Sequence, residues 1–317
     1  MVAKIFIDGE AGTTGLQIRE RLAGRRDLEV VSIAPEKRKD QDERRRLLNL
    51  ADIAILCLPD EAAKESVRLI ENGTTRVIDA STAHRVAEGW TYGFAEMEEG
   101  QTAAIAKARY VANPGCWPQG LIAAARPLVE ARLLPGDYPL SYHGISGYSG
   151  GGRQMIEEYE AEGKAASQYM PYALTFQHKH LPEMAHYAKL NRAPLFEPVV
   201  GNFAQGMSTS LPLHLDMVAD IPSGKDLHAA LADFYAAIPG SFVRVAPYDP
   251  DLGKSAALDP QAHNGTNTLT LHVFANDERA QAVIRAVYDN LGKGAAGAAV
   301  QNLNIMLGVD PRESLVA

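Results

Sequence analysis

The residues that most clearly could take part in a reaction are Cys116 and the segment around it, Asn113 to Gly120. Cys116 follows a predicted strand, Arg109 to Ala112, and Pro118 suits the first turn of a helix, where a missing N–H costs no hydrogen bond. We therefore expect the sulfur at a helix start, where N–H groups and the helix dipole favour the nucleophilic thiolate and could hold an oxyanion. A buried, inert cysteine is the alternative interpretation.

The second group that could take part in a reaction is a pair of histidines, His178 and His180. On an extended strand, two histidines at this spacing would point the same way. A zinc site would need further ligands at a known spacing, which Glu183 and His186 do not provide, so we expect no metal. A general acid and base that partners Cys116 is the more economical hypothesis, and surface histidines are the alternative.

A glycine-rich turn near the N-terminus is typical of a phosphate-binding site. The predicted strand Ala3 to Asp8 leads directly into the turn, and a helical pattern follows over Leu16 to Leu22. Glycines let the backbone approach a pyrophosphate closely, and the helix start points its N–H groups at the charge. The spacing G-x-x-G-x-x-G is less common than G-x-G-x-x-G, and a plain tight turn is the alternative. The candidate cofactor-binding residues here are Gly9, Gly12, Thr13, Thr14 and Gly15.

The second predicted strand, Leu28 to Ile33, indicates which coenzyme is bound. It carries Ser32 near its end and no immediate carboxylate, and the basic segment Lys37 to Lys39 follows. A carboxylate here would bind a ribose 2′-hydroxyl, whereas a hydroxyl with basic side chains suits a 2′-phosphate. We therefore expect NADP rather than NAD. The alternatives are that Glu36 supplies the acid or that the charged segment is only solvated surface.

Alternating strands and helices in the first third of the chain predict a parallel, Rossmann-like sheet. Asp52 to Leu58 and Arg76 to Asp79 are predicted strands, with a helix from Glu61 to Asn72 between them. Arg85 follows the carboxyl end of a strand, where ligands bind in such sheets, and a guanidinium matches phosphate geometry. Arg85 is therefore a candidate anion ligand, with a surface arginine as the alternative.

From Leu140 onward the pattern changes to strands with a period of two, which predicts an α+β domain with a mainly antiparallel sheet. Ser149 and Gly150 lie in a glycine-dense segment that could approach a second phosphate or the nicotinamide, or be a flexible loop. The predicted strands are Leu140 to Ser146, Pro198 to Phe203, Ser208 to Met217, Phe242 to Val245 and Thr268 to Phe274. The predicted helices are Gln154 to Glu162, Glu278 to Leu291 and Gly294 to Leu307.

The composition limits the classes of protein that fit. The chain has 317 residues, more than one ordinary core, so two domains are expected. Its net charge of -8 argues against nucleic-acid binding and favours small-molecule partners. It has two cysteines, too few for a disulfide framework, and no apolar run of about 18 residues that could span a membrane. We expect a cytoplasmic protein that does not enter a membrane.

Six segments together resemble the short form of the N-acetyl-gamma-glutamyl-phosphate reductase family, a relative of aspartate-semialdehyde dehydrogenase. They are Phe6–Leu22 (FIDGEAGTTGLQIRERL), Val77–Arg85 (VIDASTAHR), Val111–Gly120 (VANPGCWPQG), Ser146–Ile156 (SGYSGGGRQMI), His178–Met184 (HKHLPEM) and Asp289–Gly308 (DNLGKGAAGAAVQNLNIMLG). The combination spans nearly the whole chain and is specific, although each segment alone is not. The sequence departs from the usual family residues at Trp117, Gln119 and His84, where tyrosine, threonine and an aromatic such as phenylalanine are common.

The resemblance implies an NADPH-dependent reductase of N-acetyl-gamma-glutamyl phosphate in arginine biosynthesis, acting through a cysteine thioester. It implies that Cys116 is acylated, that His178 is the acid and base, and that His180 is its substitute or a substrate contact. By the same comparison, Arg85 binds the substrate phosphate. NADPH is expected on the Gly9 to Gly15 turn. The remaining cofactor residues implied are Ser149 and Gly150 near the nicotinamide, and Asn302 in the final helix.

The resemblance also implies a domain organisation and an oligomer. The NADP-binding Rossmann domain is expected over residues 1–116, joined by the C-terminal helix 293–317, and the catalytic and dimerisation α+β domain over 117–292. Families of this type are commonly dimers or tetramers, so a homo-oligomer is expected. Two other functions remain open: an aspartate-semialdehyde dehydrogenase-type reductase of another acyl phosphate, and an NADP-binding redox sensor.

Overall fold

The computed structural model describes residues 2–249, 251, 253 and 258–317. The chain divides into two compact units. The first comprises Met1–Ala95, Gly100–Gly115 and Ala295–Val316, and the second comprises Glu96–Glu99, Cys116–Gly294 and Ala317. The chain therefore passes between the units several times.

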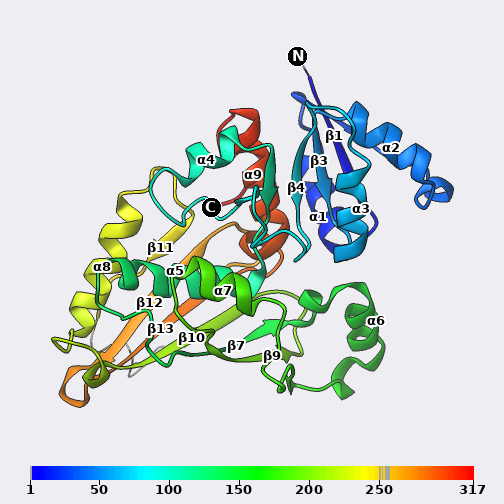
Figure 1. Cartoon of the computed structure of the whole chain (residues 1–317). Helices are drawn as coiled ribbons and strands as arrows, with labels where there is room; N and C mark the ends of the chain where they lie inside the picture. Colours follow the sequence, from blue (N-terminus) through cyan, green and yellow to red (C-terminus); the bar gives the residue numbers. More distant parts are fainter. Residues whose placement is uncertain (1, 250, 252, 254–257) are drawn as a thin grey trace. The chain divides into compact units, whose positions relative to one another are not determined.

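The first unit is built on a parallel sheet of six strands in the order β2-β1-β3-β4-β6-β5, among the residues described (Figure 1). This arrangement confirms the predicted Rossmann-like sheet. The strands are β1 (Ala3–Asp8), β2 (Leu28–Val31), β3 (Ile53–Leu56), β4 (Arg76–Asp79), β5 (Thr91–Tyr92) and β6 (Tyr110–Ala112). The helices of this unit are α1 (Thr13–Leu22), α2 (Gln41–Leu50), α3 (Asp60–Arg68), α4 (Gln101–Lys107) and α9 (Gly297–Leu307).

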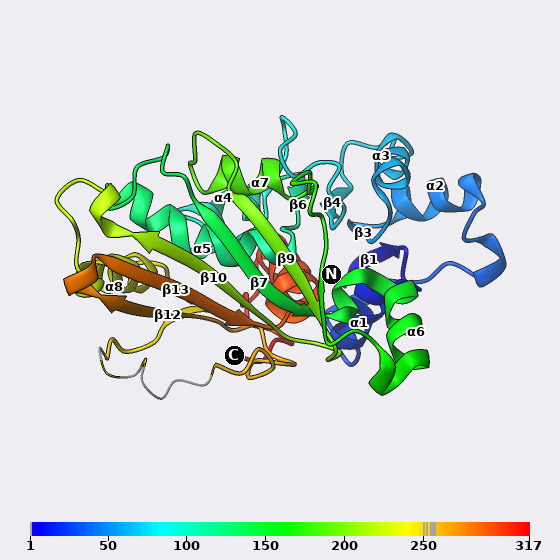
Figure 2. The same cartoon turned by 90° about the horizontal axis from the view of Figure 1, so that it is seen from below.

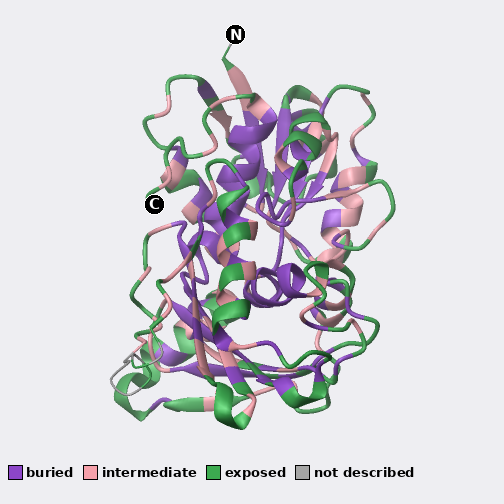
Figure 3. Cartoon of the chain, turned by 90° about the vertical axis from the view of Figure 1, so that its left-hand side faces the viewer, coloured by how far each residue is buried: buried purple, intermediate pink, exposed green. Residues whose placement is uncertain are grey.

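Both faces of this sheet are buried, which explains why consecutive apolar residues occur at the centre of β1 and throughout β3. On one face Ile5 and Ile7 of β1 pack with α1 and α9, and on the other Phe6 packs with α2 and α3. The last helix, α9, thus belongs to the same core as the first strand. Figure 3 shows buried residues concentrated along the strands, with exposed residues on the outer surfaces of the helices.

The second unit is built on a mixed, mostly antiparallel sheet of seven strands in the order β11-β12-β13-β10-β7-β9-β8, within the described part of the chain. The pairs β7 with β9 and β11 with β12 are parallel. The strands are β7 (Ser141–Gly147), β8 (Tyr169–Pro171), β9 (Leu195–Gly201), β10 (Met207–His214), β11 (Val243–Val245), β12 (Leu269–Asn276) and β13 (Gln281–Tyr288). This sheet confirms the expected α+β architecture.

One face of the second sheet is covered by helices. The helix α5 contacts β10, β12 and β13, and α8 contacts β11 and β12. Figure 2 looks onto the other face, with α5 and α8 behind the sheet. The helices of this unit are α5 (Cys116–Glu130), α6 (Gly152–Glu162), α7 (Leu181–Tyr187) and α8 (Gly224–Ala236), and a π-helical turn covers Gly292–Ala296.

The structure corrects three sequence expectations. The segment predicted as a helix from Glu278 to Leu291 is a turn followed by β13, because its backbone pairs with β10 on one side and with β12 on the other. The helix predicted to reach Asn72 ends at Arg68. His178 and His180 lie in a turn before α7 and not on a strand. Within the described ranges, no helix combines the length and apolar character needed to cross a lipid bilayer.

Candidate active site

Cys116 is the first residue of α5, as the sequence predicts. Its side chain is neither fully buried nor fully exposed. Two buried tyrosines hold the first turn of the helix from the sheet below: Tyr288 donates its hydroxyl to the Cys116 carbonyl at 2.7 Å, and Tyr142 donates to the Trp117 carbonyl at 2.9 Å. Gly120 fits here because a side chain would collide with both hydroxyls. The sulfur is thus carried on a turn with a fixed backbone.

An aromatic cluster extends from this turn toward the histidine pair. The Trp117 indole N–H donates to the Tyr172 hydroxyl at 3.0 Å, and the Trp117 ring lies 5.3 Å from that of Phe196. The His178 ring centre is 5.1 Å from Phe196 and 5.8 Å from Tyr172. Burial raises the pKa of the Tyr172 phenol, and negative charge at Cys116 raises it further. The structure therefore brings the aromatic neighbours of Cys116 and of His178 into one cluster within the second unit.

The two histidines lie close together although the segment is a turn. Their ring centres are 4.6 Å apart, with the planes at 70°. The backbone N–H of His180 donates to Nδ1 of His178 at 3.1 Å. Because Nδ1 accepts this bond, neutral His178 carries its proton on Nε2, an assignment made from the hydrogen-bond geometry. His178 is half-buried and His180 is buried. The bond thus favours one neutral tautomer of His178, the one that carries its proton on Nε2.

The segment before α9 forms the other side of the Cys116 turn. A Cβ atom on Gly294 would lie 3.0 Å from the Cβ atom of Cys116, closer than most such contacts, so this backbone packs tightly against the cysteine. The buried amide of Gln119 donates to the Lys293 carbonyl at 2.6 Å. These contacts join residues about 175 positions apart in the sequence, and sequence reasoning missed them together with Tyr142 and Tyr288.

The glycine turn has the geometry of a phosphate-binding turn. Gly9 has a φ of 92°, and a Cβ atom there would overlap the Cys57 carbonyl oxygen. A Cβ atom on Gly15 would lie 2.5 Å from the Gly9 carbonyl oxygen. Helix α1 begins at Thr13 with Gly12 as the N-cap, which has no side chain to cap the helix. Both the close approach of the backbone and the uncapped helix start suit a pyrophosphate.

A basic residue that the sequence analysis did not identify lies beside the end of β2. Ser32 is exposed, and its hydroxyl accepts a bond from Arg19 of α1 at 3.2 Å and donates to Glu10 at 3.4 Å. Arg19 also forms an ion pair with Glu10. The segment Lys37 to Lys39 is exposed. The cation beside Ser32 is therefore Arg19, which stands one and a half helical turns into α1.

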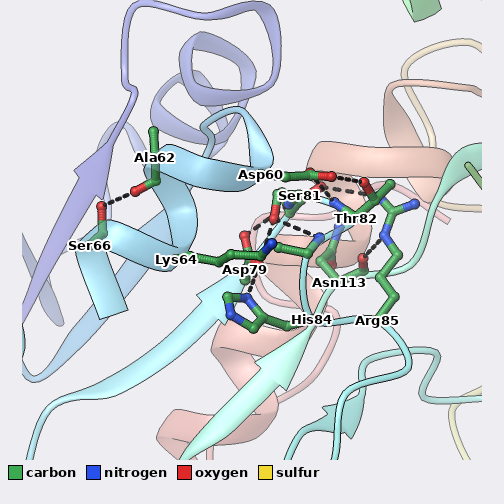
Figure 4. A network of polar contacts seen from close by, with 12 residues as sticks. Asp60, Ala62, Lys64, Ser66, Asp79, Ser81, Thr82, His84, Arg85 and Asn113 are labelled. Atoms are coloured by element: carbon green, nitrogen blue, oxygen red, sulfur yellow. Dashed lines mark hydrogen bonds and ion pairs between the residues drawn. The ribbon is translucent and has the colours of Figure 1, made fainter. Parts of the chain in front are cut away.

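The loop after β4 is held by a buried carboxylate. Asp79 is fully buried and accepts bonds from the backbone N–H of Ser81 at 2.9 Å and from its hydroxyl at 2.7 Å. His84 Nδ1 lies 2.6 Å from the same carboxylate, and Thr82 is bonded to Asp60 (Figure 4). These bonds fix the backbone of the loop that carries Arg85.

Arg85 is buried at the carboxyl end of the parallel sheet. Its Nε donates to the Asn113 carbonyl and its Nη2 to the Ala80 carbonyl, each at 3.1 Å (Figure 4). The side chain of Asn113 accepts from Nδ2 of Asn302 at 3.0 Å. Two predicted site residues thus share Asn113 as a partner: Arg85 bonds its backbone carbonyl, and Asn302 bonds its side chain.

The remaining predicted cofactor residues have defined surroundings. Asn302 is fully buried and also donates to the Gly93 carbonyl at 2.9 Å, and its side-chain oxygen has no hydrogen-bond partner among the described residues. In the second unit, Ser149 is buried and accepts from Nδ2 of Asn290 at 2.9 Å, whereas Gly150 is exposed. The described ranges contain no cluster of three or more histidine, cysteine or carboxylate side chains suited to a metal ion.

Comparison with known families and proteins identifies both units. Residues 4–105 match the family model described as semialdehyde dehydrogenase, NAD binding domain, and residues 116–290 match semialdehyde dehydrogenase, dimerisation domain. The chain is 64% identical to the N-acetyl-gamma-glutamyl-phosphate reductase of Chelativorans sp. (strain BNC1), covering 97% of this chain and 99% of that one. This chain belongs to the N-acetyl-gamma-glutamyl-phosphate reductase family. The resemblance drawn from its sequence motifs is confirmed.

A second relative supports the assignment to the N-acetyl-gamma-glutamyl-phosphate reductase family, and a solved structure shares the fold. The Mesorhizobium japonicum reductase is 63% identical over 98% of this chain and 100% of its own. Aspartate semialdehyde dehydrogenase II of Vibrio cholerae has a TM-score of 0.71 at 14% identity, covering 97% of this chain and 99% of that one. At that identity the likeness concerns the fold alone.

The structure explains how this N-acetyl-gamma-glutamyl-phosphate reductase family member uses its three unusual residues. Trp117 adds an indole N–H that tyrosine would lack and bonds Tyr172 with it. Gln119 is long enough to reach the Lys293 carbonyl. His84 keeps an aromatic surface by stacking on Trp90, with ring centres 4.0 Å apart, and adds the bond to Asp79.

Proposed function

We propose that this chain is an N-acetyl-gamma-glutamyl-phosphate reductase that uses NADPH, forms N-acetylglutamate semialdehyde and releases phosphate, as one step of arginine biosynthesis. The observation that carries the proposal is the position of Cys116 as the first residue of α5, on a turn bonded to two tyrosines. The full-length relatives of 63% and 64% identity support the choice of substrate.

The first chemical step is attack by the Cys116 sulfur on the carbonyl carbon of the acyl phosphate. The S–C bond forms, the C–O bond to phosphate breaks, and a thioester results. The N–H groups at the start of α5 are placed to stabilise the thiolate before attack and the oxyanion during it. The leaving phosphate takes the proton that the net reaction consumes.

The glycine turn fits a dinucleotide, because Gly9 and Gly15 leave the space that a Cβ atom would fill. Gly12, Thr13 and Thr14 at the start of α1 would bind the pyrophosphate through their N–H groups. The buried side-chain oxygen of Asn302 is an acceptor that lacks a partner among the described residues, which suits a carboxamide donor. When bound, the coenzyme supplies a hydride to the thioester carbon, and we assign Ser149 and Gly150 to the nicotinamide side.

His178 acts as the acid and base. In its neutral form, with the proton on Nε2, the ring can donate a hydrogen bond to the oxygen of the tetrahedral intermediate. When the ring is doubly protonated, it can give the Nε2 proton to that oxygen and take it back as the C–S bond breaks and the aldehyde leaves. In the phosphorylating direction, the ring with its proton on Nδ1 and a free lone pair on Nε2 would remove the proton of the hemithioacetal hydroxyl as hydride departs. His180 fixes this tautomer through its backbone N–H, and we assign its buried ring to the substrate.

Arg85 is proposed as the ligand of the substrate phosphate. Its bonds to two backbone carbonyls fix the plane of the guanidinium, and a fixed guanidinium recognises phosphate oxygens with little loss of side-chain entropy. An Arg85→Lys variant keeps the charge but loses the planar group. We expect it to raise the KM for phosphate more than the KM for the aldehyde.

NADP is proposed as the coenzyme rather than NAD. Ser32 and Arg19 offer a hydroxyl and a cation to a 2′-phosphate at the end of β2, and the ion pair with Arg19 neutralises the carboxylate of Glu10. An Arg19→Ala variant tests this assignment. It should raise the KM for NADPH and leave the KM for NADH nearly unchanged, whereas an equal effect on both coenzymes would contradict it.

The domain organisation and the oligomer are also proposals. We assign residues 1–116 with 293–317 to cofactor binding and 117–292 to catalysis and self-association. The dimerisation-domain match over residues 116–290 supports a homo-oligomer, a dimer or a tetramer. Light scattering during size-exclusion chromatography measures the mass directly, and a monomer at micromolar concentration would contradict the assignment.

The function is tested by phosphate-dependent oxidation of N-acetylglutamate semialdehyde. Cys116→Ser is compared with Cys57→Ser, a matched control in which burial raises the thiol pKa to about 12 and so keeps the thiol unreactive. We expect the first variant to lose turnover and the second to keep it. Quenched wild-type enzyme should yield a Cys116 peptide carrying the acyl chain by mass spectrometry.

The same assay separates the alternatives. Turnover of aspartate semialdehyde in preference to N-acetylglutamate semialdehyde would overturn the proposed substrate. Reversible oxidation of Cys116 without turnover of either aldehyde would favour a redox sensor. Wild-type turnover by Cys116→Ser would remove the cysteine from the mechanism.

A further inference from the structure

A buried ion pair near the candidate nucleophile has no part in the chemistry described above. Nζ of Lys293 lies 2.6 Å from Oε2 of Glu96, and each side chain is 1% exposed. The other carboxylate oxygen of Glu96 accepts from the Phe242 backbone N–H at 3.2 Å, and Nζ of Lys293 is 5.7 Å from the centre of the Phe242 ring. Burial lowers the pKa of the Lys293 ammonium, and Glu96 opposes that shift.

Such a pair is a poor way to stabilise a fold. Removing two charges from water costs about as much as their attraction returns, and apolar side chains of similar volume often serve equally well. The pair is therefore better understood through what it holds in place. Glu96 and Lys293 come from segments nearly 200 residues apart, and each segment lies where the chain passes between the two units.

The backbone of Lys293 connects this pair to the catalytic helix. The Lys293 carbonyl accepts the bond from Gln119, which is fully buried and stands three residues after Cys116, on the same first turn of α5. The next residue, Gly294, packs against Cys116 itself, with its would-be Cβ atom 3.0 Å from the Cβ atom of the cysteine. The ion pair, the Gln119 bond and the Gly294 contact therefore form one continuous set of contacts that ends at Cys116.

We propose that Glu96, Lys293 and Gln119 are positioning residues, which hold the backbone of Lys293 and Gly294 against the first turn of α5 and so fix the direction of the Cys116 sulfur. This inference rests on the proposed function of Cys116. None of the three residues touches the substrate in this role. They act through the backbone at Lys293 and Gly294, which limits the space on one side of the sulfur.

The test uses variants that remove the contacts without leaving a charge buried. Glu96→Gln with Lys293→Met removes both charges and keeps an amide oxygen for the Phe242 N–H, and Gln119→Leu removes one hydrogen bond. Lys189→Met is the matched control, since it removes the ion pair from Lys189 to Glu130 at 2.7 Å on an exposed part of the same unit. All variants are made in a Cys57→Ser background, so that iodoacetamide reports on Cys116 alone.

Two measurements distinguish positioning from a general loss of structure. We expect kcat to fall by roughly ten- to a hundredfold, as for misplacement of a reacting group by about 1 Å, with KM values changed by less than about twofold. We also expect the pH profile of Cys116 alkylation to move to higher pH, because the thiolate loses its alignment with the helix N–H groups. Lys189→Met should change neither quantity.

Each outcome decides between the hypotheses. If Gln119→Leu and the double variant fold and keep the wild-type kcat and alkylation profile, the positioning role is wrong. If the double variant fails to fold, Gln119→Leu alone decides, since it introduces no buried charge. If the wild type shows no phosphate-dependent turnover but the variants still shift the alkylation profile, the proposed function fails while the positioning role stands.

Discussion

Replacement of Gly120 by alanine gives the sharpest test of how the catalytic turn is built. In an exposed helix interior, alanine is favoured over glycine by about 1 kcal/mol. In α5, a Cβ atom at this position would lie 2.7 Å from the hydroxyl oxygens of Tyr142, Tyr288 and Thr209, closer than such atoms approach. We therefore expect Gly120→Ala to destabilise the chain, opposite to its intrinsic helix propensity.

The size of the effect follows from the bonds that would be displaced. Tyr288 and Tyr142 are buried, and they donate to the carbonyls of Cys116 and Trp117. Each buried polar group left without its partner costs about 1 to 3 kcal/mol. After the gain in helix propensity, the expected net loss is roughly 3 kcal/mol. At about 2.1 cal/mol/K of unfolding entropy per residue, this loss corresponds, for a chain of 317 residues, to a fall in Tm of about 4 to 5 °C.

Thermal unfolding followed by circular dichroism measures this fall. Gly73→Ala is the matched control, since a Cβ atom there would have no neighbour within 4 Å, and its Tm should be unchanged. In a Tyr142→Phe, Tyr288→Phe background the hydroxyls are absent, so the same Gly120→Ala change should cost less. A Gly120→Ala protein with a Tm equal to or above that of the wild type would refute the reasoning.

Three further predictions concern the glycine turn and a buried ion pair in the first unit, and two histidines in the second. Gly9→Ala forces a residue with a side chain into the left-handed region of backbone conformation, which costs about 1 to 3 kcal/mol. We expect the affinity for NADPH, measured by fluorescence, to fall at least about tenfold. Unchanged affinity would argue against the proposed cofactor turn. Arg44→Met leaves the buried Asp8 carboxylate without its 3.1 Å partner and should lower stability by about 3 to 5 kcal/mol, and a wild-type urea midpoint would contradict this. Burial lowers the pKa of His263 and His272 below 6.5, so the unfolded chain binds more protons and stability is lost as the pH falls from about 7 to 5; His272→Gln should lose less stability than the wild type over this range.

The parallel sheet could be predicted from the sequence because its signal is local. The run Ala3 to Asp8 has three consecutive large apolar residues at its centre, Ile5 to Ile7, and β1 has these same bounds, since residues on both sides of the strand are buried. The segment that became β13 was mispredicted for the opposite reason. Gln281 to Tyr288 is short and rich in alanine and valine, and what makes it a strand is its pairing with β10 and β12, which no local pattern encodes.

The candidate site also contains features that the local sequence predicts and contacts that it does not. The position of Cys116 at a helix start follows from Pro118 and the preceding strand, and the phosphate turn follows from the spacing of its glycines. The partners that fix these elements come from distant segments: Tyr288 and Lys293 reach the Cys116 turn from more than 170 residues away. Arg19, rather than Lys37 to Lys39, is the cation beside Ser32, because the helix α1 returns past the end of β2.

The contacts around Cys116 also explain how one turn can be rigid and still reactive. The tyrosine hydroxyls of Tyr288 and Tyr142 bind carbonyl oxygens of the first turn, and Gln119 binds a neighbouring carbonyl through its side chain. These bonds act on carbonyl oxygens, whereas the N–H groups at the start of α5 are the groups that favour a thiolate and an oxyanion. A scaffold that held the turn through its N–H groups would compete with the negative charge that the proposed reaction develops. Fixing the helix start through bonds to its carbonyl oxygens therefore gives the Cys116 backbone, and with it the sulfur, a defined position.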